Sequence, residues 1–493
     1  MEGTLARPER RELAPGLEIS RIVTGLWQVA DMERDGRTLD PEPAAAALAE
    51  YAEAGFDTFD MADHYGSAEE ITGRFLAGAA RREPALEPGA RPVAFTKWCP
   101  PPGEITAEVV RTAIERSRSR LGVDTIDLLQ LHWWMYEHPG YLDAMRELTV
   151  LEREGAIAHL GVTNFDTDHL RVLTGQGFDI RTNQVSFSLL DRRARGAMTA
   201  FCREHGIGLL AYGTLGGGFL SDRWLGVAEP GDIADWSRMK YRRFIDVIGG
   251  WRVLQAILET LAEVGRKHGV SMSNVAARWV LEQPAVAAII VGARLGEREH
   301  RADNLRLFSF ALDAEDHAAI EGALAAAGDI PGDCGDEYRR PPFLTASGDL
   351  SHHLDSLPRA YPTVESNGRL RVDTGSVWEG VCGFSRAVRV GDRILVSGTT
   401  ATHGGGEMVC RGDPEGQTVY ILDKIVASVS ALGGARDDVV RTRIYLRDVD
   451  LWEAVSRVHG RYFAAARPAS TLVEVSRLVG DYDVEIEAEA IVR

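Results

Sequence analysis

Short apolar runs of strand length alternate with stretches of helical length through the first two thirds of the chain. The longer stretches commonly end in a glycine, as at Gly55, Gly122 and Gly206. Strands are predicted near Arg21–Leu26, Phe56–Phe59, Val93–Thr96, Ile126–Leu131, His159–Val162, Thr182–Val185, Gly208–Ala211 and Ala288–Val291. Helices are predicted at Pro43–Ala54, Ala107–Leu121, Tyr141–Glu154 and Ala194–Glu204. Eight such repeats favour a closed (β/α)8 TIM barrel of parallel strands over an open doubly wound sheet.

Two intervals stand outside this repeat. Before the first strand, Arg11–Ile19 contains a Pro-Gly turn, which predicts a hairpin that plugs the barrel floor. The long gap between the last two strands leaves room for an inserted loop and an extra helix.

The pattern changes after residue 330. Residues 331–372 are rich in Pro and Gly and keep no steady hydrophobic period, which predicts a linker, part of it draped over the barrel. From residue 373 to 493 an α+β pattern begins, with a hairpin turn at Gly391-Asp392. Its predicted strands are Arg386–Val390, Arg393–Ser397, Val440–Leu446, Thr471–Val475 and Val484–Val492, and its helices are Glu415–Leu432 and Leu451–Ala464. We therefore expect a barrel over 1–330, a linker over 331–372 and a smaller domain over 373–493.

Composition narrows the class of protein. The chain has 493 residues, 45% of them hydrophobic and 26% charged, as in soluble globular proteins. The net charge of −18 argues against a general role on nucleic acids or membrane surfaces, because both repel an acidic protein. The five cysteines are scattered and form no C-x-x-C pair, which argues against a zinc ribbon or a disulfide scaffold. With no apolar run long enough to span a bilayer and no secretory signal, a cytoplasmic location is expected.

Polar side chains close three consecutive predicted strands. Asp60 and Tyr65 follow the second strand, Lys97 ends the third and His132 ends the fourth. The carboxyl ends of barrel strands form one mouth, so these four side chains are predicted to meet there. A phenol is a weak acid, and a nearby ammonium held by a carboxylate is expected to lower its pKa. An imidazole can then orient a carbonyl oxygen for protonation.

This half of the chain resembles the aldo-keto reductases over residues 15 to 325. The matching segments are Gly25-Leu-Trp-Gln28, the loop from Asp60 to Tyr65-Gly66, Thr96-Lys97, Leu131-His132, Gly161-Val-Thr-Asn164, Asn183-Gln184, Ala211-Tyr-Gly-Thr-Leu215, Arg278-Trp279 and Ile290-Val-Gly-Ala-Arg294 with Asn304. The resemblance implies NAD(P)H-dependent reduction of a carbonyl, or its reverse, without metal or flavin. It also implies that Tyr65 is the general acid, that Lys97 and Asp60 tune it, and that His132 orients the substrate.

The resemblance carries cofactor residues as well. Asn164 and Gln184 would hold the nicotinamide carboxamide, Tyr212 would stack on the ring, and the glycine-rich loop Gly213–Leu220 would approach the pyrophosphate. Arg294, Arg298 and Arg301 could meet a 2′-phosphate, which favours NADPH over NADH. The full implied set is Thr163, Asn164, Gln184, Tyr212, Gly213, Leu215, Gly217, Gly292, Ala293, Arg294, Arg298 and Asn304.

Tryptophans flank the predicted mouth. Trp27, Trp98 and Trp133, with Trp134 beside the last, are expected either to line a pocket for an apolar or ring-shaped substrate or to pack the barrel rim.

Residues 373–493 resemble the Rid family of enamine and imine deaminases, which have a chorismate-mutase-like α+β fold. The matching segments are Phe384 to Arg393, Val396-Ser-Gly398, Arg443-Ile-Tyr-Leu, Arg467-Pro-Ala-Ser-Thr-Leu-Val-Glu-Val and Val484-Glu-Ile-Glu-Ala-Glu-Ala. The resemblance implies a homotrimer with ligand sites between subunits, and Glu487 aligns with the family's site glutamate. Where deaminating members carry arginine and tyrosine, this chain has Ser470 and Phe384, and a serine cannot bind a carboxylate bidentately. Deamination by this half is therefore not expected.

Three functions remain open from the sequence. The first is a NADPH-dependent reductase of aldehydes or ketones fused to a trimerising domain. In the second, the Rid-like domain binds or hydrolyses an imine and the barrel reduces the C=O or C=N product. The third is an NADPH-binding sensor or scaffold, against which the complete set of Asp60, Tyr65, Lys97 and His132 weighs.

Overall fold

Eight parallel strands close into a barrel in the order β10, β3, β4, β5, β6, β7, β8, β9. The computed structural model describes residues 7–29, 39–80, 91–231, 233, 235–296, 300–339 and 359–492. The barrel strands are β3 (Ile22–Gly25), β4 (Thr58–Asp60), β5 (Val93–Trp98), β6 (Leu128–His132), β7 (Leu160–Thr163), β8 (Thr182–Ser186), β9 (Gly208–Tyr212) and β10 (Val286–Gly292). The predicted TIM barrel is confirmed.

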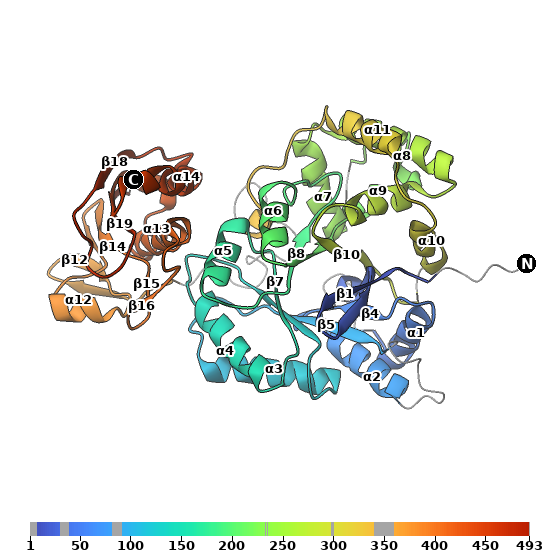
Figure 1. Cartoon of the computed structure of the whole chain (residues 1–493), viewed down its shortest axis with the longest axis horizontal. Helices are drawn as coiled ribbons and strands as arrows, with labels where there is room; N and C mark the ends of the chain where they lie inside the picture. Colours follow the sequence, from blue (N-terminus) through green and yellow to red (C-terminus); the bar gives the residue numbers. More distant parts are fainter. Residues whose placement is uncertain are drawn as a thin grey trace, which may run out of the picture.

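A ring of helices surrounds the strands (Figure 1). They are α1 (Pro41–Glu53), α2 (Ala68–Ala80), α3 (Ala107–Leu121), α4 (Tyr141–Arg153), α5 (Thr167–Gly175), α6 (Ala197–Glu204), α7 (Trp236–Val247), α8 (Trp251–His268), α9 (Met272–Leu281), α10 (Arg301–Leu305) and α11 (Ala314–Leu324). Local chemistry sets their ends: Thr106 caps α3 by accepting the N–H of Val109, and Gly122 ends it with a φ of 64°. The gap between the last two strands holds α7, α8 and α9.

A hairpin closes the amino-terminal end of the barrel, as predicted. Its strands are β1 (Arg10–Ala14) and β2 (Leu17–Ser20). Leu17 and Ile19 pack in a buried cluster with barrel side chains that include Phe95 and Leu210. With the floor plugged by apolar side chains, the polar ends of the strands remain at the opposite mouth.

The C-terminal domain is a separate α+β unit, drawn in orange to red in Figure 1. Its main sheet runs in the order β11, β12, β13, β14, β19, β17, β18. The elements are β11 (Thr363–Ser366), β12 (Arg369–Val372), α12 (Val377–Cys382), β13 (Ala387–Val390), β14 (Arg393–Thr399), β15 (Thr402–His403), β16 (Glu407–Met408), α13 (Pro414–Ala431), β17 (Val439–Leu446), α14 (Trp452–Phe463), β18 (Ala469–Glu474) and β19 (Val484–Ile491). Val484, Ile486, Ala488 and Ala490 are buried, with the alternate glutamates on the other face.

Part of the expected linker is structured. Strands β11 and β12 lie in the range 331–372 and extend the C-terminal sheet by pairing with β13. Cys334, Asp336 and Glu337 are buried against the barrel, and η6 (Asp336–Tyr338) lies at its mouth. The expected linker is therefore too long at both ends, because polar strand residues and buried charges were indistinguishable from loop composition. Residues 340–358 lie outside the described residues.

The two domains contact each other through α5 and α13, which lie side by side in Figure 1. Within the described residues, none of the helices combines the length and the apolar composition needed to cross a bilayer.

Candidate active site

A cavity opens at the carboxyl ends of the barrel strands, where active sites of such barrels lie. Its volume is about 620 Å³. Asp60 from β4, Lys97 from β5, His132 from β6 and Tyr65 from the loop after β4 all line it. The structure thus brings together the four side chains that the sequence placed at one mouth.

The carboxylate of Asp60 is buried and accepts hydrogen bonds from three side chains. The Nζ of Lys97 donates to its Oδ2 at 2.5 Å, and the amides of Gln130 and Gln184 donate to its Oδ1 at 3.1 and 2.8 Å. Lys97 also donates to the carbonyl of Met61 at 2.9 Å. Buried charges persist only when paired and hydrogen-bonded, so this network fixes the ammonium in place. Gln130 was missed from the sequence, although an amide inside an apolar strand was the available signal.

Tyr65 keeps its proton in this environment. Burial raises the pKa of its phenol well above the usual value, and the carboxylate of Asp60 adds to the shift. The Nζ of Lys97 lies 5.2 Å from the ring centroid. The depressed pKa that we expected for Tyr65 is not found in this structure, because burial and Asp60 outweigh any stabilisation of the phenolate by Lys97. A phenol that holds its proton is suited to donate it only when negative charge develops nearby.

His132 is neutral and offers a hydrogen-bonding atom. Burial lowers the pKa of its imidazole well below the usual value, and the guanidinium of Arg339 lowers it further. Its Nε2 atom is buried without a hydrogen bond among the described residues. A buried polar atom without a partner costs free energy that a ligand can recover. A carbonyl oxygen bound here would supply that partner.

Most of the expected cofactor residues line the same cavity. They are Thr163, Asn164, Gln184, Tyr212, Gly213, Leu215, Gly217, Gly292, Arg294 and Asn304. Ala293 is buried and does not line it, and Arg298 lies outside the described residues. The Nε2 of Gln184 donates a hydrogen bond to Asp60, and the Oδ1 of Asn164 accepts a hydrogen bond from the hydroxyl of Tyr212 at 2.7 Å.

The glycine-rich loop fits a close ligand. Gly213 and Gly217 have φ angles of 68° and 63°, which favour glycine. A Cβ on Gly213 would lie 2.0 Å from the hydroxyl of Tyr241, and one on Gly217 would lie 2.8 Å from its ring. Glycine is therefore required at both positions, and it leaves backbone exposed to the cavity. Such backbone suits a pyrophosphate.

Charges of both signs surround the far end of the cavity. Arg294 pairs with Asp235 at 3.1 Å, and both line the cavity with Asp303. Arg301 instead pairs with Glu50 at 2.9 Å and does not line the cavity, so its expected contact with a 2′-phosphate is not supported. Arg223 and Arg238, which the sequence did not single out, do line it.

The tryptophans divide into two groups. Trp27 and Trp134 line the cavity, with Trp27 5.0 Å from the ring of Tyr65 and Trp134 4.1 Å from the ring of His132. Trp98 and Trp133 are buried and do not line it, which corrects their assignment to the substrate pocket. Side chains alternate along a strand, so Trp98 points away from the mouth that Lys97 faces.

The segment after α11 supplies unpredicted groups. Tyr338 lines the cavity, 5.6 Å from the ring of His132, and its hydroxyl accepts from Lys240 at 2.9 Å. Glu337 is fully buried, pairs with Arg193 at 2.8 Å and accepts the hydroxyl of Tyr212 at 3.0 Å. These contacts anchor the segment across the mouth. Glu337 and Tyr338 could not be identified from the sequence, because no hydrophobic periodicity distinguishes this segment from a loop.

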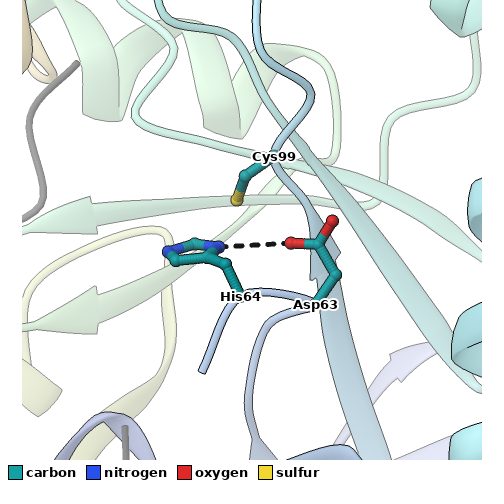
Figure 2. Close-up of side chains that lie close together, drawn as sticks. All are labelled: Asp63, His64 and Cys99. Carbon is teal, nitrogen blue, oxygen red and sulfur yellow. Dashed lines mark hydrogen bonds and ion pairs between the residues drawn. The ribbon is translucent and has the colours of Figure 1, made fainter. Parts of the chain in front are cut away.

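Asp63, His64 and Cys99 form a cluster beside the cavity (Figure 2). One potential ligand atom from each lies within 4.8 Å of the others, a donor set that zinc accepts. However, Arg116 lies 3.7 Å from Asp63, and burial with the Asp63 carboxylate raises the pKa of the Cys99 thiol well above its usual value. A protonated thiol and a neighbouring guanidinium both oppose cation binding, so we assign no metal here.

The expected Rid-like site is not assembled within one chain. Glu487 accepts from Arg443 at 2.6 Å and from Tyr445 at 3.2 Å on the exposed face of the sheet. Ser470 pairs with Thr442 in the parallel register and accepts its hydroxyl at 3.0 Å, so it lies on the opposite face. The ring of Phe384 lies against Arg386. Strand alternation thus puts Ser470 and Glu487 of one chain on opposite faces, and their expected grouping between subunits stays a prediction.

Comparisons with known proteins assign the barrel. Residues 21–325 match the model of the aldo/keto reductase family. The chain belongs to this family. Residues 378–492 match the model described as endoribonuclease L-PSP, to which the Rid-like proteins correspond. Members of the aldo/keto reductase family use nicotinamide cofactors, so the barrel is that of an oxidoreductase acting on carbonyls.

Several relatives of this aldo/keto reductase have curated names. The NADH-specific methylglyoxal reductase of Escherichia coli is 25% identical over an alignment of 304 positions, and the match covers 57% of this chain and 88% of that protein. The 6-dehydroglucose reductase of Novosphingobium aromaticivorans is 29% identical over 307 aligned positions, and the match covers 59% of this chain and 88% of that protein. An uncharacterized Streptomyces coelicolor protein is 40% identical over 124 residues, 24% of this chain and 90% of its own.

Among solved structures, the glycerol dehydrogenase of Gluconobacter oxydans resembles the barrel. It gives a TM-score of 0.53 at 24% identity and covers 68% of this chain and 98% of its own. This likeness supports the fold of the aldo/keto reductase barrel.

Proposed function

We propose that the barrel reduces an aldehyde or ketone, or oxidises the corresponding alcohol, with a nicotinamide dinucleotide. The observation that carries the proposal is the pairing of a protonated Tyr65 with a neutral His132 in one cavity. The buried Lys97–Asp60 pair lies behind them. These groups offer one proton, one hydrogen bond and one fixed positive charge around the same space.

Each side chain has a role in this proposal. When bound, the reduced nicotinamide supplies the hydride. His132 holds the carbonyl oxygen through Nε2–H, and Tyr65 donates its proton to that oxygen as charge develops. The ammonium of Lys97 stabilises the phenolate that remains, and Asp60 keeps the ammonium in position.

The cofactor is proposed to be NADP(H), with NAD(H) as the alternative. Asn164 and Gln184 would hold the carboxamide, and Tyr212 would stack on the nicotinamide ring. Arg294, with Arg223 and Arg238, supports a 2′-phosphate contact because guanidinium suits that anion. A phosphate there would replace Asp235 as the partner of Arg294.

The proposed substrates are small carbonyl compounds with a flat or ring-shaped body. Trp27, Trp134 and Tyr338 line the cavity around the reacting groups, and aromatic walls favour such shapes. The names of the relatives, a methylglyoxal reductase and a 6-dehydroglucose reductase, support small oxygenated carbonyls.

The test is NADPH and NADH oxidation against a panel of aldehydes, ketones, sugars and cyclic imines. The Tyr65→Phe variant is expected to lose roughly 10²- to 10⁴-fold in kcat while it binds cofactor normally, because only the proton donor is removed. Tyr141→Phe, which alters a buried tyrosine outside the cavity, should leave kcat unchanged. Retained turnover in Tyr65→Phe contradicts the assigned role, and binding of NADPH with no reduction favours a sensor.

For the C-terminal domain we propose trimerisation, which the resemblance to Rid proteins supports. Ser470 in place of an arginine does not favour deamination of carboxylate-bearing imines by this domain, because a serine cannot bind a carboxylate bidentately.

A further inference from the structure

A buried imidazole joins the two domains. His169 lies in the first turn of α5 on the barrel, and Asp423 lies on α13 of the C-terminal domain. The Nδ1 of His169 is 2.7 Å from Oδ1 of Asp166, and its Nε2 is 2.7 Å from Oδ2 of Asp423. The side chains are only 2%, 9% and 7% exposed for His169, Asp166 and Asp423. Each domain thus supplies one carboxylate to the same ring.

The geometry requires a charged ring. Both nitrogens face carboxylates, and only the imidazolium carries an N–H for each. Burial opposes this charge, but Asp166 and Asp423 outweigh it and raise the pKa of His169 to about 10. Burial raises the pKa of Asp423 to about 6, so its carboxylate remains ionised at neutral pH. Tyr462 donates to the second oxygen of Asp423 at 2.5 Å and fixes its orientation.

Stacked side chains continue from this ring to the cavity. The ring of Tyr136 stacks on His169, with centroids 3.3 Å apart and planes inclined by 6°. The guanidinium of Arg339 lies 4.1 Å from the centroid of Tyr136. It donates to the carbonyl of Asn164 at 2.6 Å and to the carbonyl of Trp133, the residue after His132. The path therefore ends on the backbone of two cavity segments.

Asn164 has a left-handed backbone conformation with a φ of 58°. Asparagine adopts this region more readily than other non-glycine residues, and contacts to its carbonyl help to hold it there. The segment after α11 packs directly on Asn164, since a Cβ on Gly335 would lie 2.1 Å from the carbonyl oxygen of Asn164. Its side chain lines the cavity and accepts from Tyr212.

We infer that His169 and Asp423 are positioning residues of the cofactor site, through which the C-terminal domain holds Asn164 in the geometry that binds the nicotinamide end. The inference rests on the proposed function for the identity of the ligand. It makes the C-terminal domain a fixed part of the barrel's site, in addition to any role in oligomerisation.

Polar contacts around the buried pair hold the domains in one orientation. Arg461 pairs with Asp168 at 2.6 Å, Arg171 pairs with Glu415 at 2.9 Å, and His403 contacts Asp143 at 2.9 Å. These pairs are more exposed, so each contributes little free energy by itself. They supply a control at the same interface that does not reach Tyr136 or Arg339.

The first experiment measures the Kd of NADPH and of NADH by fluorescence titration of the full chain at pH 8. Asp423→Asn is expected to weaken binding roughly 2- to 30-fold, the range for changes along a coupled network. Arg339→Gln, at the other end of the path, should weaken it similarly. Glu415→Gln removes the ion pairs with Arg171 and Arg457 at the same interface and should leave both Kd values unchanged.

The second experiment follows the same Kd values from pH 7 to about pH 10.5. A raised folded-state pKa means that the His169 contacts are present at lower pH and are lost as the pH rises through about 10. Asp423→Asn should bring this loss to lower pH, because one carboxylate no longer stabilises the cation. A purely docking role predicts no such shift. The titratable or charged groups around His169 and its partners are Asp166, Asp168, Asp423, Tyr136, Tyr141, Tyr462, Asp333, Glu137, Arg339 and Arg461. The three tyrosines have pKa values raised well above their usual value, so they do not titrate first.

Unchanged affinity and an unchanged pH midpoint in a folded Asp423→Asn protein would overturn the inference. If that variant does not fold, Arg339→Gln and the wild-type pH profile decide, and a flat wild-type profile overturns it. Cofactor binding is measured without turnover. A wild-type protein that binds cofactor but reduces no carbonyl would therefore refute the proposed function and leave the positioning inference to its own test.

Discussion

At the scale of single residues, the protonation state of His132 is the feature most open to measurement. Its pKa is depressed by burial and by Arg339, so the folded protein takes up no proton there as the pH falls below about 6.5, whereas the unfolded chain does. The stability that the folded protein has with a neutral His132 is thus fully present above that pH and is lost progressively below it. Relative to His132→Gln, the wild-type free energy of unfolding should fall by up to about 2 kcal/mol between pH 7 and pH 5.

Urea unfolding at a series of pH values measures this difference. His205→Gln, which changes an exposed histidine on the same barrel, should follow the wild-type curve. Parallel curves for wild type and His132→Gln would show that His132 is protonated in the folded protein, and its proposed role as a neutral donor would fail.

At the scale of elements, the segment after α11 owes its position to one buried carboxylate. Glu337 pairs with Arg193 and Lys240 and holds η6 across the cavity. Burial opposes its charge, but Arg193 and Lys240 outweigh it and lower the pKa of Glu337 to about 2. Its stabilising effect is therefore present above pH ~4.5 and is lost as the pH falls towards 2. Glu337→Gln leaves buried cations without their shared partner and should cost about 3 kcal/mol of unfolding free energy at pH 7.

The matched control lies in the same segment. Asp329 is 84% exposed and pairs with Arg192 at 2.7 Å, so Asp329→Asn should cost less than about 1 kcal/mol. Denaturant unfolding compares the two variants. Glu337→Gln should also raise the KM for substrate, since Tyr338 would no longer be held beside His132. Equal stability of the two variants would contradict this account of the segment.

At the scale of the whole molecule, the exposed face of the C-terminal sheet is the candidate trimer surface. Glu485, Glu487 and Glu489 lie in a row there with Arg443 and Tyr445. Light scattering after size exclusion should give the mass of three chains for the wild type. Glu487→Arg should shift the mass towards one chain, because it places two cations together on that face.

A charge reversal away from this face supplies the comparison. Glu453 on α14 is 67% exposed, and Glu453→Arg should keep the wild-type mass. A wild-type protein that elutes as a single chain would refute the trimer, whatever the variants do.

The whole molecule also shows where sequence-based expectations held. Strand-end residues Asp60, Lys97 and His132 were placed correctly, because a parallel barrel puts every strand end at one mouth. The hairpin at the barrel floor was predicted from its Pro-Gly turn, and the division into two domains was predicted from the change in hydrophobic periodicity. The direction of the Tyr65 pKa was not accessible, since it depends on how deeply the folded chain buries the phenol.

The barrel elements and the four polar groups at its mouth can be read from the sequence alone, because periodicity and strand direction are local properties. Three-dimensional packing turns Trp98 and Trp133 away from the cavity, puts Ser470 across the sheet from Glu487 and brings Tyr338 into the site. It alone placed Asp423 against His169, some 254 positions away in the chain. Buried charges choose partners by proximity in the folded state, and no local pattern encodes that distance.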